Sequence, residues 1–341
     1  MKIILLALAV IFTLITAQAG AATPEKSKVV LAVGGRTTLY YLPLTLADRL
    51  GYFKDEGLDV EINDFPGGSR ALQALIGHSA DVVSGPYEHT IVMQTLAQKV
   101  QAFVLQGMNP GLELGIRKDR AAGYSWAKDL KGMKIGVSAP GSSTHMLVNH
   151  LLASVGLKQD DVSIIGVGTG PSAVAAMRSG EIDALSGVEP VMTLLERSGD
   201  IKIVVETITE KGVRDVFGGS MPAATLYARA DFIEQNPHTV QALTNAIVRA
   251  LLWLQHSTTE DVLNAVPPEY LLGDKALYAA SFERLRPTYS KDGMIPKKGV
   301  DNSYKVLLAH NNAVRRAPVV WINQTYTNAF VEKALQKFKR E

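Results

Sequence analysis

The sequence repeats one order of strands and helices when it is shifted against itself by 102 residues. The shift needs no gap, and it aligns Asp81-x-x-Ser84-Gly85 with Asp183-x-x-Ser186-Gly187. Further coinciding pairs are Gly34 and Gly136, Leu50 and Leu152, Asp59-Val60 and Asp161-Val162, Ile62 and Ile164, Gly68 and Gly170, Ala71 and Ala173, and Ala74 and Ala176. These pairs fall at turns and core positions of a βαβαβ unit, which predicts two lobes built on one plan. The alternative is that any two α/β segments share glycines and aspartates at strand ends.

The repeat consists of short apolar, often β-branched runs that alternate with helical stretches. The expected strands are 29–33, 60–63, 81–84, 102–105, 134–137, 162–167, 184–186 and 202–205. The expected helices between them include 43–50, 69–76, 144–154 and 172–179. Strands that alternate with helices form βαβ units and a mainly parallel sheet, so the sequence predicts an α/β fold.

The length and composition exclude several classes of protein. A chain of 341 residues suffices for about two domains with a core each. Its 35 basic and 33 acidic residues are interspersed, so no electrostatic footprint for a nucleic-acid partner exists. The sequence has no cysteine, which excludes disulfides, zinc–thiolate sites, Fe–S clusters and thiol catalysis.

Residues 1–21 have the pattern of a secretory signal peptide. Lys2 is followed by an apolar run over residues 3–15 and by small residues that fit a cleavage site. The run is too short to span a bilayer comfortably, although a retained membrane anchor is the alternative. We therefore expect export, most simply to a bacterial periplasm, with cleavage near Ala19-Gly20 or Ala21-Ala22.

The loops that follow the strands are the expected location of a ligand. In open parallel sheets, ligands bind outside the carboxyl ends of the strands, and two facing lobes would form a cleft there. The six loops concerned are 34–42, 65–70, 84–89, 137–145, 168–172 and 186–190. No metal site or cofactor is expected, because G-x-G-x-x-A over residues 168–173 is a weak dinucleotide signature and the histidines are scattered.

Several side chains in these loops are suited to binding a small molecule. Residues 142–144 lead into a helix whose free N–H groups attract an anion, unless they are simply a helix cap. Tyr40 and Tyr41 are candidates for an aromatic wall. The full set of candidate ligand-binding residues is Arg36, Tyr40, Tyr41, Gly68, Ser69, Tyr87, Glu88, Ser142, Ser143, Thr144, His145, Ser172 and Glu189.

Two glutamates, Glu88 and Glu189, fall in matching loops of the two lobes. With His89 they could act as an acid–base pair, or they could bind ammonium or hydroxyl groups of a ligand. More often such residues cap a helix or bridge two lobes. No G-x-S-x-G, H-E-x-x-H or Walker motif occurs, so we expect a protein that is not an enzyme.

Five segments resemble a known family. They are residues 47–60, which include Leu50-Gly51-Tyr52-Phe53-Lys54-Asp55-Glu56-Gly57-Leu58, then Phe65-Pro66-Gly67-Gly68-Ser69, residues 129–137, Pro140-Gly141-Ser142-Ser143 and Gly180-Glu181-Ile182-Asp183-Ala184. Together they resemble the substrate-binding proteins of nitrate, sulfonate and taurine ABC importers, in the larger group that includes thiamine-pyrimidine-binding proteins. The similarity covers about residues 28–260.

The resemblance implies a type II periplasmic-binding-protein clamshell with two α/β lobes and a two-segment hinge. Lobe 1 would comprise residues 22–112 and 225–341, and lobe 2 residues 113–224. The chain would cross near residues 112–117 and return near residues 221–227. Family ligand contacts usually come from the loop after the first strand, the Gly85-type loop, residues 142–144 and the Glu189-Pro190 loop.

The resemblance also implies a small-molecule ligand, with ABC permease and ATPase subunits as partners and no part embedded in the membrane. Sulfonate binders often carry neutral or other residues where this chain has Glu88 and Glu189, which disfavours a simple sulfonate. We expect a small organic anion or zwitterion: a sulfonate, an aromatic carboxylate or a nitrogen compound. Fungal pyrimidine-synthesising enzymes of this group depend on a cysteine-rich stretch that is missing here. The alternatives are a periplasmic enzyme that uses Glu88 and Glu189, and a sensor subunit with the same clamshell.

Overall fold

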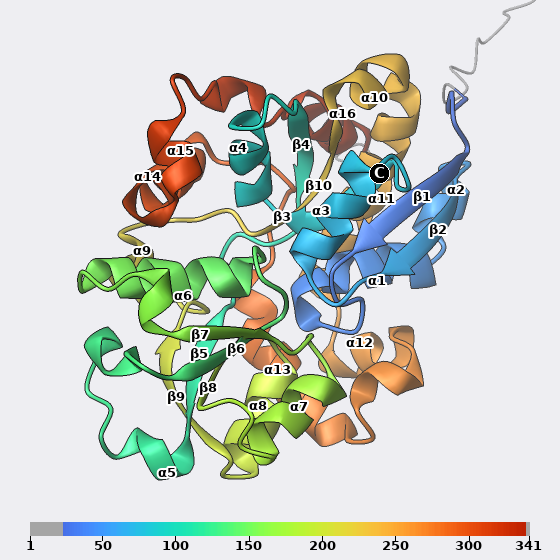
Figure 1. Ribbon diagram of the computed structural model, residues 1–341. Helices are drawn as coiled ribbons and strands as arrows, with labels where there is room; N and C mark the ends of the chain where they lie inside the picture. Colours follow the sequence, from blue (N-terminus) through green and yellow to red (C-terminus); the bar gives the residue numbers. More distant parts are fainter. Residues whose placement is uncertain (1–22, 339–341) are drawn as a thin grey trace, which may run out of the picture.

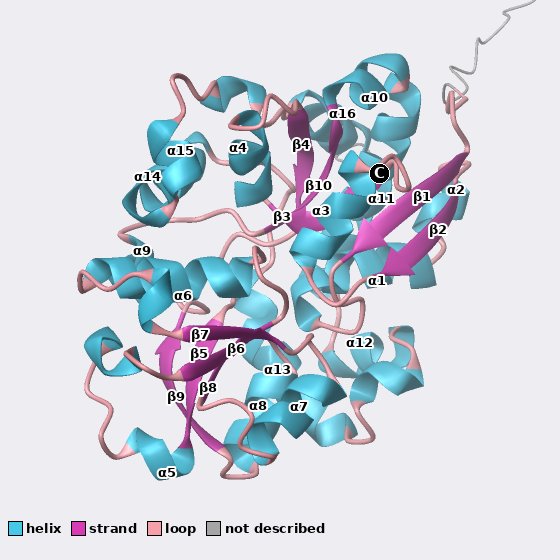
Figure 2. Ribbon diagram, viewed as in Figure 1, coloured by secondary structure: helices cyan, strands magenta, loops and turns pink. Residues whose placement is uncertain are grey.

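Two five-stranded sheets, each surrounded by helices, form the two lobes of the computed structural model, which describes residues 23–338 (Figures 1 and 2). The strand order of the first sheet is β2 (Asp59–Asp64), β1 (Lys28–Val33), β3 (Val82–Pro86), β10 (Ala224–Arg229) and β4 (Val100–Leu105). The order of the second is β7 (Ser163–Gly166), β6 (Lys134–Val137), β8 (Ala184–Gly187), β5 (Glu113–Arg117) and β9 (Ile201–Glu206). The predicted two-lobed α/β fold is therefore confirmed, while the predicted signal peptide lies outside the described residues.

The two sheets have the same topology. In each, the strand that reaches across from the other lobe lies antiparallel between two neighbours, β10 between β3 and β4, and β5 between β8 and β9. Leu31 lies opposite Val82 in the first sheet, and Ile135 lies opposite Ala184 in the second. The shift of 102 residues is thus correct for β3 and β8, but β1 and β6 are displaced by two further residues. The match of Gly34 with Gly136 is consequently not a structural equivalence.

The helices extend the same two-lobe plan. Those near the first sheet in Figure 1 are α1 (Leu42–Arg49), α2 (Tyr52–Asp55), α3 (Gly68–Ile76), α4 (Glu88–Gln94), α10 (Ala230–Gln235), α11 (Pro237–His256) and α16 (Ala329–Phe338). Those near the second are α5 (Lys118–Ala121), α6 (Ser143–Ser154), α7 (Pro171–Arg178), α8 (Val191–Arg197) and α9 (Glu210–Phe217). The remaining α-helices are α12 (Thr259–Ala265), α13 (Lys275–Leu285), α14 (Lys297–His310) and α15 (Asn312–Arg316). Short 3-10 helices are η1 (Leu39–Tyr41), η2 (Ala127–Leu130), η3 (Gln159–Asp161), η4 (Pro268–Leu271), η5 (Arg286–Thr288) and η6 (Ile322–Gln324).

The predicted strands and helices agree with the observed ones to within two residues at each end. β5 and β10 lie at the two crossings that the family resemblance implied, and strands β5–β9 fall within residues 113–224. The lobe limits themselves stay a prediction. The segment after β10 touches both lobes, since α14 packs against α6 and α13 contacts α8.

Helix α11 provides much of the core of the first lobe. It begins at Pro237, whose fixed φ and missing N–H suit the first helical position. Leu243, Ile247, Leu251 and Leu254 recur at helical spacing and are buried, and the helix packs against α1 and α16. Within residues 23–338, no helix combines the length and the apolar character needed to cross a bilayer.

A close backbone contact joins the end of β1 to the start of α3. A Cβ atom added at Gly34 would lie 2.2 Å from the Gly68 nitrogen and 2.3 Å from the Gly67 carbonyl carbon. Because these neighbours are backbone atoms, no rotamer change can relieve the clash. Glycine at position 34 is therefore required to bring the loop after β1 against the start of α3.

We predict that Gly34→Ala lowers the free energy of unfolding by about 2–3 kcal/mol, since the two backbones must separate. Urea unfolding measures this change. The matched control is Gly123→Ala, where the nearest atom to an added Cβ is 3.9 Å away, and where a change within about 0.5 kcal/mol is expected. Equal effects of the two substitutions would contradict the packing argument.

Candidate functional site

The loops at the carboxyl ends of the strands meet across the interface between the lobes. The Ser69 backbone nitrogen donates to Ser142 Oγ at 3.0 Å, and Ser69 Oγ donates to the Pro140 carbonyl at 2.9 Å. On another part of the interface, the Leu39 nitrogen donates to the Glu189 carbonyl at 3.1 Å. These bonds join loops of the first lobe to loops of the second, so the structure is a closed arrangement.

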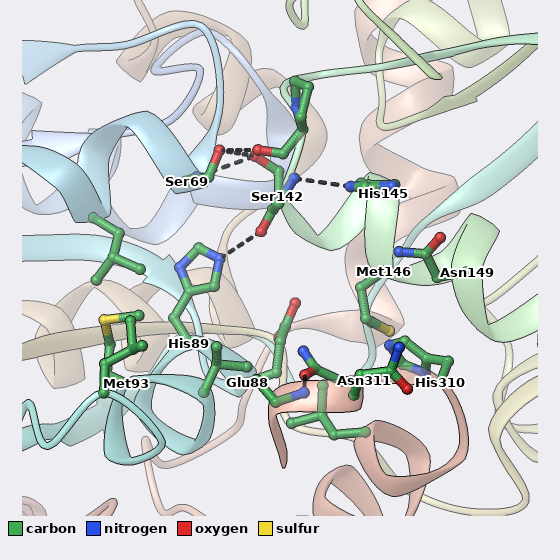
Figure 3. Close-up of a pocket in the computed structure, with 18 of the residues that line it drawn as sticks. Ser69, Glu88, His89, Met93, Ser142, His145, Met146, Asn149, His310 and Asn311 are labelled. Atoms are coloured by element: carbon green, nitrogen blue, oxygen red, sulfur yellow. Dashed lines mark hydrogen bonds between the residues drawn. The ribbon is translucent and has the colours of Figure 1, made fainter. Parts of the chain in front are cut away.

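A cavity of about 770 Å³ lies at this interface (Figure 3). Helices α3 and α4 of the first lobe line one side, residues 140–149 of the second lobe line another, and α14 and α15 complete the wall. Its apolar side chains are Leu72, Ile76, Val92, Met93, Leu96, Met146 and Leu307. A concave, largely apolar space with a few polar groups is typical of a site for a small molecule.

Four of the predicted site residues line this cavity: Ser69, Glu88, Ser142 and His145. Others lie in the closed interface without lining it. Tyr40 and Tyr41 are buried with their rings edge to face at 4.8 Å between centroids. Gly68 begins α3, and an added Cβ there would meet Pro86 at 2.9 Å. Ser143 begins α6 and is buried.

The remaining predicted residues bond within their own surroundings. Arg36 pairs with Asp48 at 2.8 Å. The Tyr87 hydroxyl lies 2.6 Å from Thr325 Oγ1 in the first lobe. Thr144 Oγ1 accepts a hydrogen bond from the Ser138 nitrogen at 3.0 Å, and Ser172 Oγ donates to the Val167 carbonyl. A ligand role for these residues stays a prediction.

Glu88 is a buried carboxylate without a full set of partners. It is 4% exposed, and its Oε1 atom has no hydrogen-bond partner. Burial raises the pKa of Glu88 to about 7. Burial also raises the pKa of Tyr40 and Tyr41, and the charge of Glu88 raises both further. The carboxylate and the two phenol rings therefore form one electrostatically connected group.

Three histidines surround the cavity in neutral form. Burial lowers the pKa of His145, and it lowers that of His89 and His310 to about 4. His145 Nδ1 accepts a hydrogen bond from the Gly141 nitrogen at 2.9 Å, so the neutral ring carries its proton on Nε2. That Nε2 has no partner.

Sequence reasoning missed the contribution of the C-terminal segment to the site. His310, Asn311 and Asn312, at the junction of α14 and α15, line the cavity. No motif or repeat marks these residues. They reach the site only because α14 packs against α6 of the other lobe.

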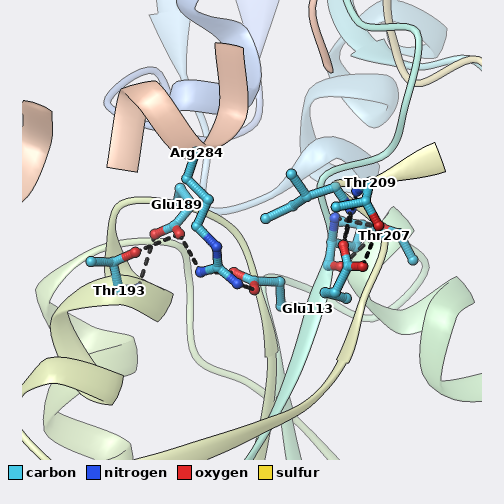
Figure 4. Close-up of polar contacts among 9 residues, drawn as sticks. Glu113, Glu189, Thr193, Thr207, Thr209 and Arg284 are labelled. Carbon is cyan, nitrogen blue, oxygen red and sulfur yellow. Dashed lines mark hydrogen bonds and ion pairs between the residues drawn. The ribbon is translucent and has the colours of Figure 1, made fainter. Parts of the chain in front are cut away.

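Glu189 is bonded to other groups of the protein, close to the start of β5 (Figure 4). Its carboxylate accepts from the Thr193 nitrogen and hydroxyl, and from Arg284 Nη1 at 2.9 Å. Arg284 also bonds Glu113 at the start of β5. Both glutamates are fully buried. Burial and the charge of Glu189 raise the pKa of Glu113 to about 8, against the opposing effect of Arg284.

Arg284 comes from α13, whereas both of its partners belong to strands and loops of the second lobe. One guanidinium thus ties the C-terminal segment to the crossing strand and to the Glu189 loop. A nearby bond from the Leu112 nitrogen to Thr207 Oγ1 at 2.8 Å anchors the same crossing. Among the residues that the structure describes, no group of three or more histidine, aspartate or glutamate side chains is placed to hold a metal ion.

We predict that Arg284→Leu lowers the free energy of unfolding by about 3 kcal/mol, because two buried carboxylates lose their only cation. Chemical unfolding at pH 7 measures the loss. The control is Lys211→Met, which removes an exposed i,i+4 ion pair with Asp215 and should have little effect. A small effect at Arg284 would mean that the cluster does not stabilise the fold.

Two α/β lobes of the same topology that close over a cavity define the periplasmic-binding-protein fold. Residues 22–266 match the NMT1-like family. The chain therefore belongs to the NMT1-like family, and its resemblance to nitrate- and sulfonate-binding proteins is confirmed.

Similar proteins of known sequence or structure include the following. A solved structure from Bordetella bronchiseptica RB50 is 50% identical, with a TM-score of 0.90 over 93% of this chain and 100% of that one. The protein YtlA of Bacillus subtilis, named as a binding protein, is 26% identical over 266 residues, which are 76% of this chain and 77% of YtlA. The 4-amino-5-hydroxymethyl-2-methylpyrimidine phosphate synthase of Schizosaccharomyces pombe is also 26% identical, over 78% of this chain and 76% of the enzyme. The alkanesulfonate-binding protein SsuA of Xanthomonas axonopodis pv. citri, bound to MOPS, has a TM-score of 0.68 at 18% identity, over 90% of this chain and 100% of SsuA, which is a likeness of fold alone.

Proposed function

We propose that this protein is the periplasmic solute-binding component of an ABC import system, and that it holds a small organic anion or zwitterion between its lobes. The observation that carries the proposal is the cavity of about 770 Å³ whose wall comes from both lobes. Membership in the NMT1-like family supports it. The permease and ATPase subunits of the importer are the partners that this function requires.

The mechanism follows from a ligand that touches both lobes at once. Residues 22–112 with 225–341, and residues 113–224, are the units that we propose to move about β5 and β10. Opening separates Ser69 from Ser142 and gives a solute access to the interface. A bound solute then favours the closed form by the free energy of its contacts with the second lobe.

The principal rival is a periplasmic enzyme that uses Glu88 and Glu189 as an acid–base pair. The geometry favours binding over catalysis, because Glu88 lines the cavity whereas Glu189 does not and is instead bonded to Thr193 and Arg284. The similarity to a pyrimidine phosphate synthase keeps the enzyme class as the alternative. The chain has no cysteine, however, and so lacks the cysteine-rich stretch on which the fungal pyrimidine-synthesising enzymes depend. A sensor subunit would share the clamshell, and neighbouring genes for a permease and an ATPase would favour import.

We predict that a cognate solute raises the thermal unfolding midpoint by several degrees, since a ligand at 100 times its dissociation constant stabilises a protein by about 2.7 kcal/mol. The measurement is thermal unfolding of protein stripped of bound ligand, against sulfonates, nitrate, aromatic carboxylates, pyrimidines and small amines. A compound recovered unchanged supports binding. If the protein converts the compound, and if the variant Glu88→Gln no longer does so, the result would support an enzyme instead.

The cross-lobe contact at Ser142 provides a second prediction. Gly67, Ser69 and Ser142 leave no space for a larger side chain, because a Cβ added at Gly67 would lie 2.9 Å from Ser142 Oγ. We expect Ser142→Phe to prevent closure and to weaken binding at least tenfold, while the unfolding midpoint without ligand changes little. Ser154→Phe, at an exposed position of the same helix, is the control. Unchanged affinity in Ser142→Phe would remove this loop from the site.

A further inference from the structure

The cavity between the lobes contains a carboxylate but no lysine or arginine. Its lining includes Glu88 and three histidines, His89, His145 and His310. The other polar residues beside it are neutral amides and hydroxyls: Ser69, Gln73, Gln98, Ser142, Asn149, Gln159, Asn311 and Asn312. Figure 3 shows Glu88 on the first-lobe side, directed into the cavity and across it from Ser142 and His145. This charge distribution is unfavourable for a ligand that carries negative charge alone.

The chain supplies no counter-charge to this carboxylate among the groups that face it. Arg36 is paired with Asp48, and Arg284 is shared by Glu113 and Glu189. The neighbouring histidines, His89, His145 and His310, are neutral at pH 7, because burial lowers the pKa of each. A buried carboxylate without a cation is costly, and it is relieved either by a proton or by a positive charge from outside the chain.

The groups next to Glu88 suit a positive charge. Tyr40 and Tyr41 are buried near it but outside the cavity lining, and they carry no positive charge that could neutralise it. Asn149 Oδ1 lines the cavity side of the second lobe and lacks a hydrogen-bond partner, so it is an acceptor for an N–H group. The His145 Nε2–H is a donor without an acceptor, which a negatively charged or carbonyl oxygen would satisfy.

We infer that the solute carries a protonated nitrogen group, with Glu88 as its counter-ion, and an oxygen acceptor that faces His145. This inference rests on the proposed function and, within its ligand class, selects zwitterions over simple anions. The apolar part of the solute lies against the leucine, methionine and valine side chains of the cavity. A simple sulfonate or nitrate is disfavoured, because it would add a second negative charge beside an ionised Glu88 in a cavity lining without lysine or arginine.

The charge state of Glu88 makes the binding depend on pH. An ammonium group binds the ionised carboxylate, and with a pKa of about 7 the ionised fraction is roughly 10% at pH 6 and roughly 90% at pH 8. Affinity for an amine should therefore rise about tenfold between these values. An anion would show the opposite dependence, because it requires the protonated form. The pKa of His89 and His310, about 4, lies below this range, and burial lowers the pKa of His145 from its ordinary value. Burial, Tyr41 and Glu88 keep the pKa of Tyr227 raised beyond it.

The test uses two matched pairs of probes on the mature protein: benzylamine with benzoate, and taurine with ethanesulfonate. Benzoate carries a carboxylate in place of the ammonium group of benzylamine, and ethanesulfonate lacks the ammonium group of taurine, while both amines stay protonated from pH 6 to pH 8. We expect benzylamine or taurine to raise the unfolding midpoint and to bind about tenfold more tightly at pH 8 than at pH 6 in calorimetric titration. In Glu88→Gln, which removes the charge and keeps the shape, amine affinity should fall at least tenfold and lose its pH dependence.

The matched control is Glu56→Gln, since Glu56 is a buried carboxylate paired with Lys337 outside the cavity, and amine binding should survive there. Anion binding without amine binding, amine binding that survives in Glu88→Gln, or no amine binding at all would each overturn the inference. Anion binding alone would leave the proposed function intact. Only an absence of binding across the whole solute panel would count against the proposed function as well.

Discussion

A single guanidinium, that of Arg284, holds together parts of the chain that are far apart in sequence. It bonds both Glu113, where the chain enters the second lobe, and Glu189, in the loop that faces η1 of the first. Because both carboxyl groups are fully buried, the negative charge that they share must be met by the protein, and the pKa of Glu113, raised to about 8, favours a proton there beside the Glu189–Arg284 pair. The position of α13, and through it the path of the C-terminal segment along both lobes, depends on this contact.

The closed interface relies on small side chains where the lobes touch. Gly67 and Gly68 bring the start of α3 against residues 138–142, and Ser69 bonds Ser142 across the gap. These bonds are few and polar, so they can be exchanged for water on opening at modest cost. The main hydrophobic cluster includes residues of both lobes, among them Leu31 of the first and Ile135 of the second. The crossing strands β5 and β10 contribute Leu114 and Leu226 to it, so the apolar core is continuous where the chain passes between the lobes.

Much of the fold could be predicted from the sequence, because it depends on local pattern. The alternation of apolar runs and helical stretches predicted strands and helices to within two residues, and the internal repeat predicted two lobes with one topology. The gap-free shift misaligned β1 and β6 by two residues, because the first lobe has two more residues between its first two strands than the second lobe has. The candidates Tyr87 and Ser172 were chosen for their place in strand-end loops, yet both bond within their own lobes.

The sequence by itself determined the α/β class, the family, the six loops at the strand ends and the place of Glu88 in one of them, because strand periodicity and strand-end chemistry are local properties. Only the tertiary structure decided that Glu189 serves an ion-pair cluster while Glu88 faces a cavity, and that His310 and Asn311 join the site. These outcomes depend on how helices from distant segments pack, and on which buried charge finds a partner. The sequence around a carboxylate does not distinguish one that is paired with a side chain such as Arg284 from one that is left for a solute to pair with.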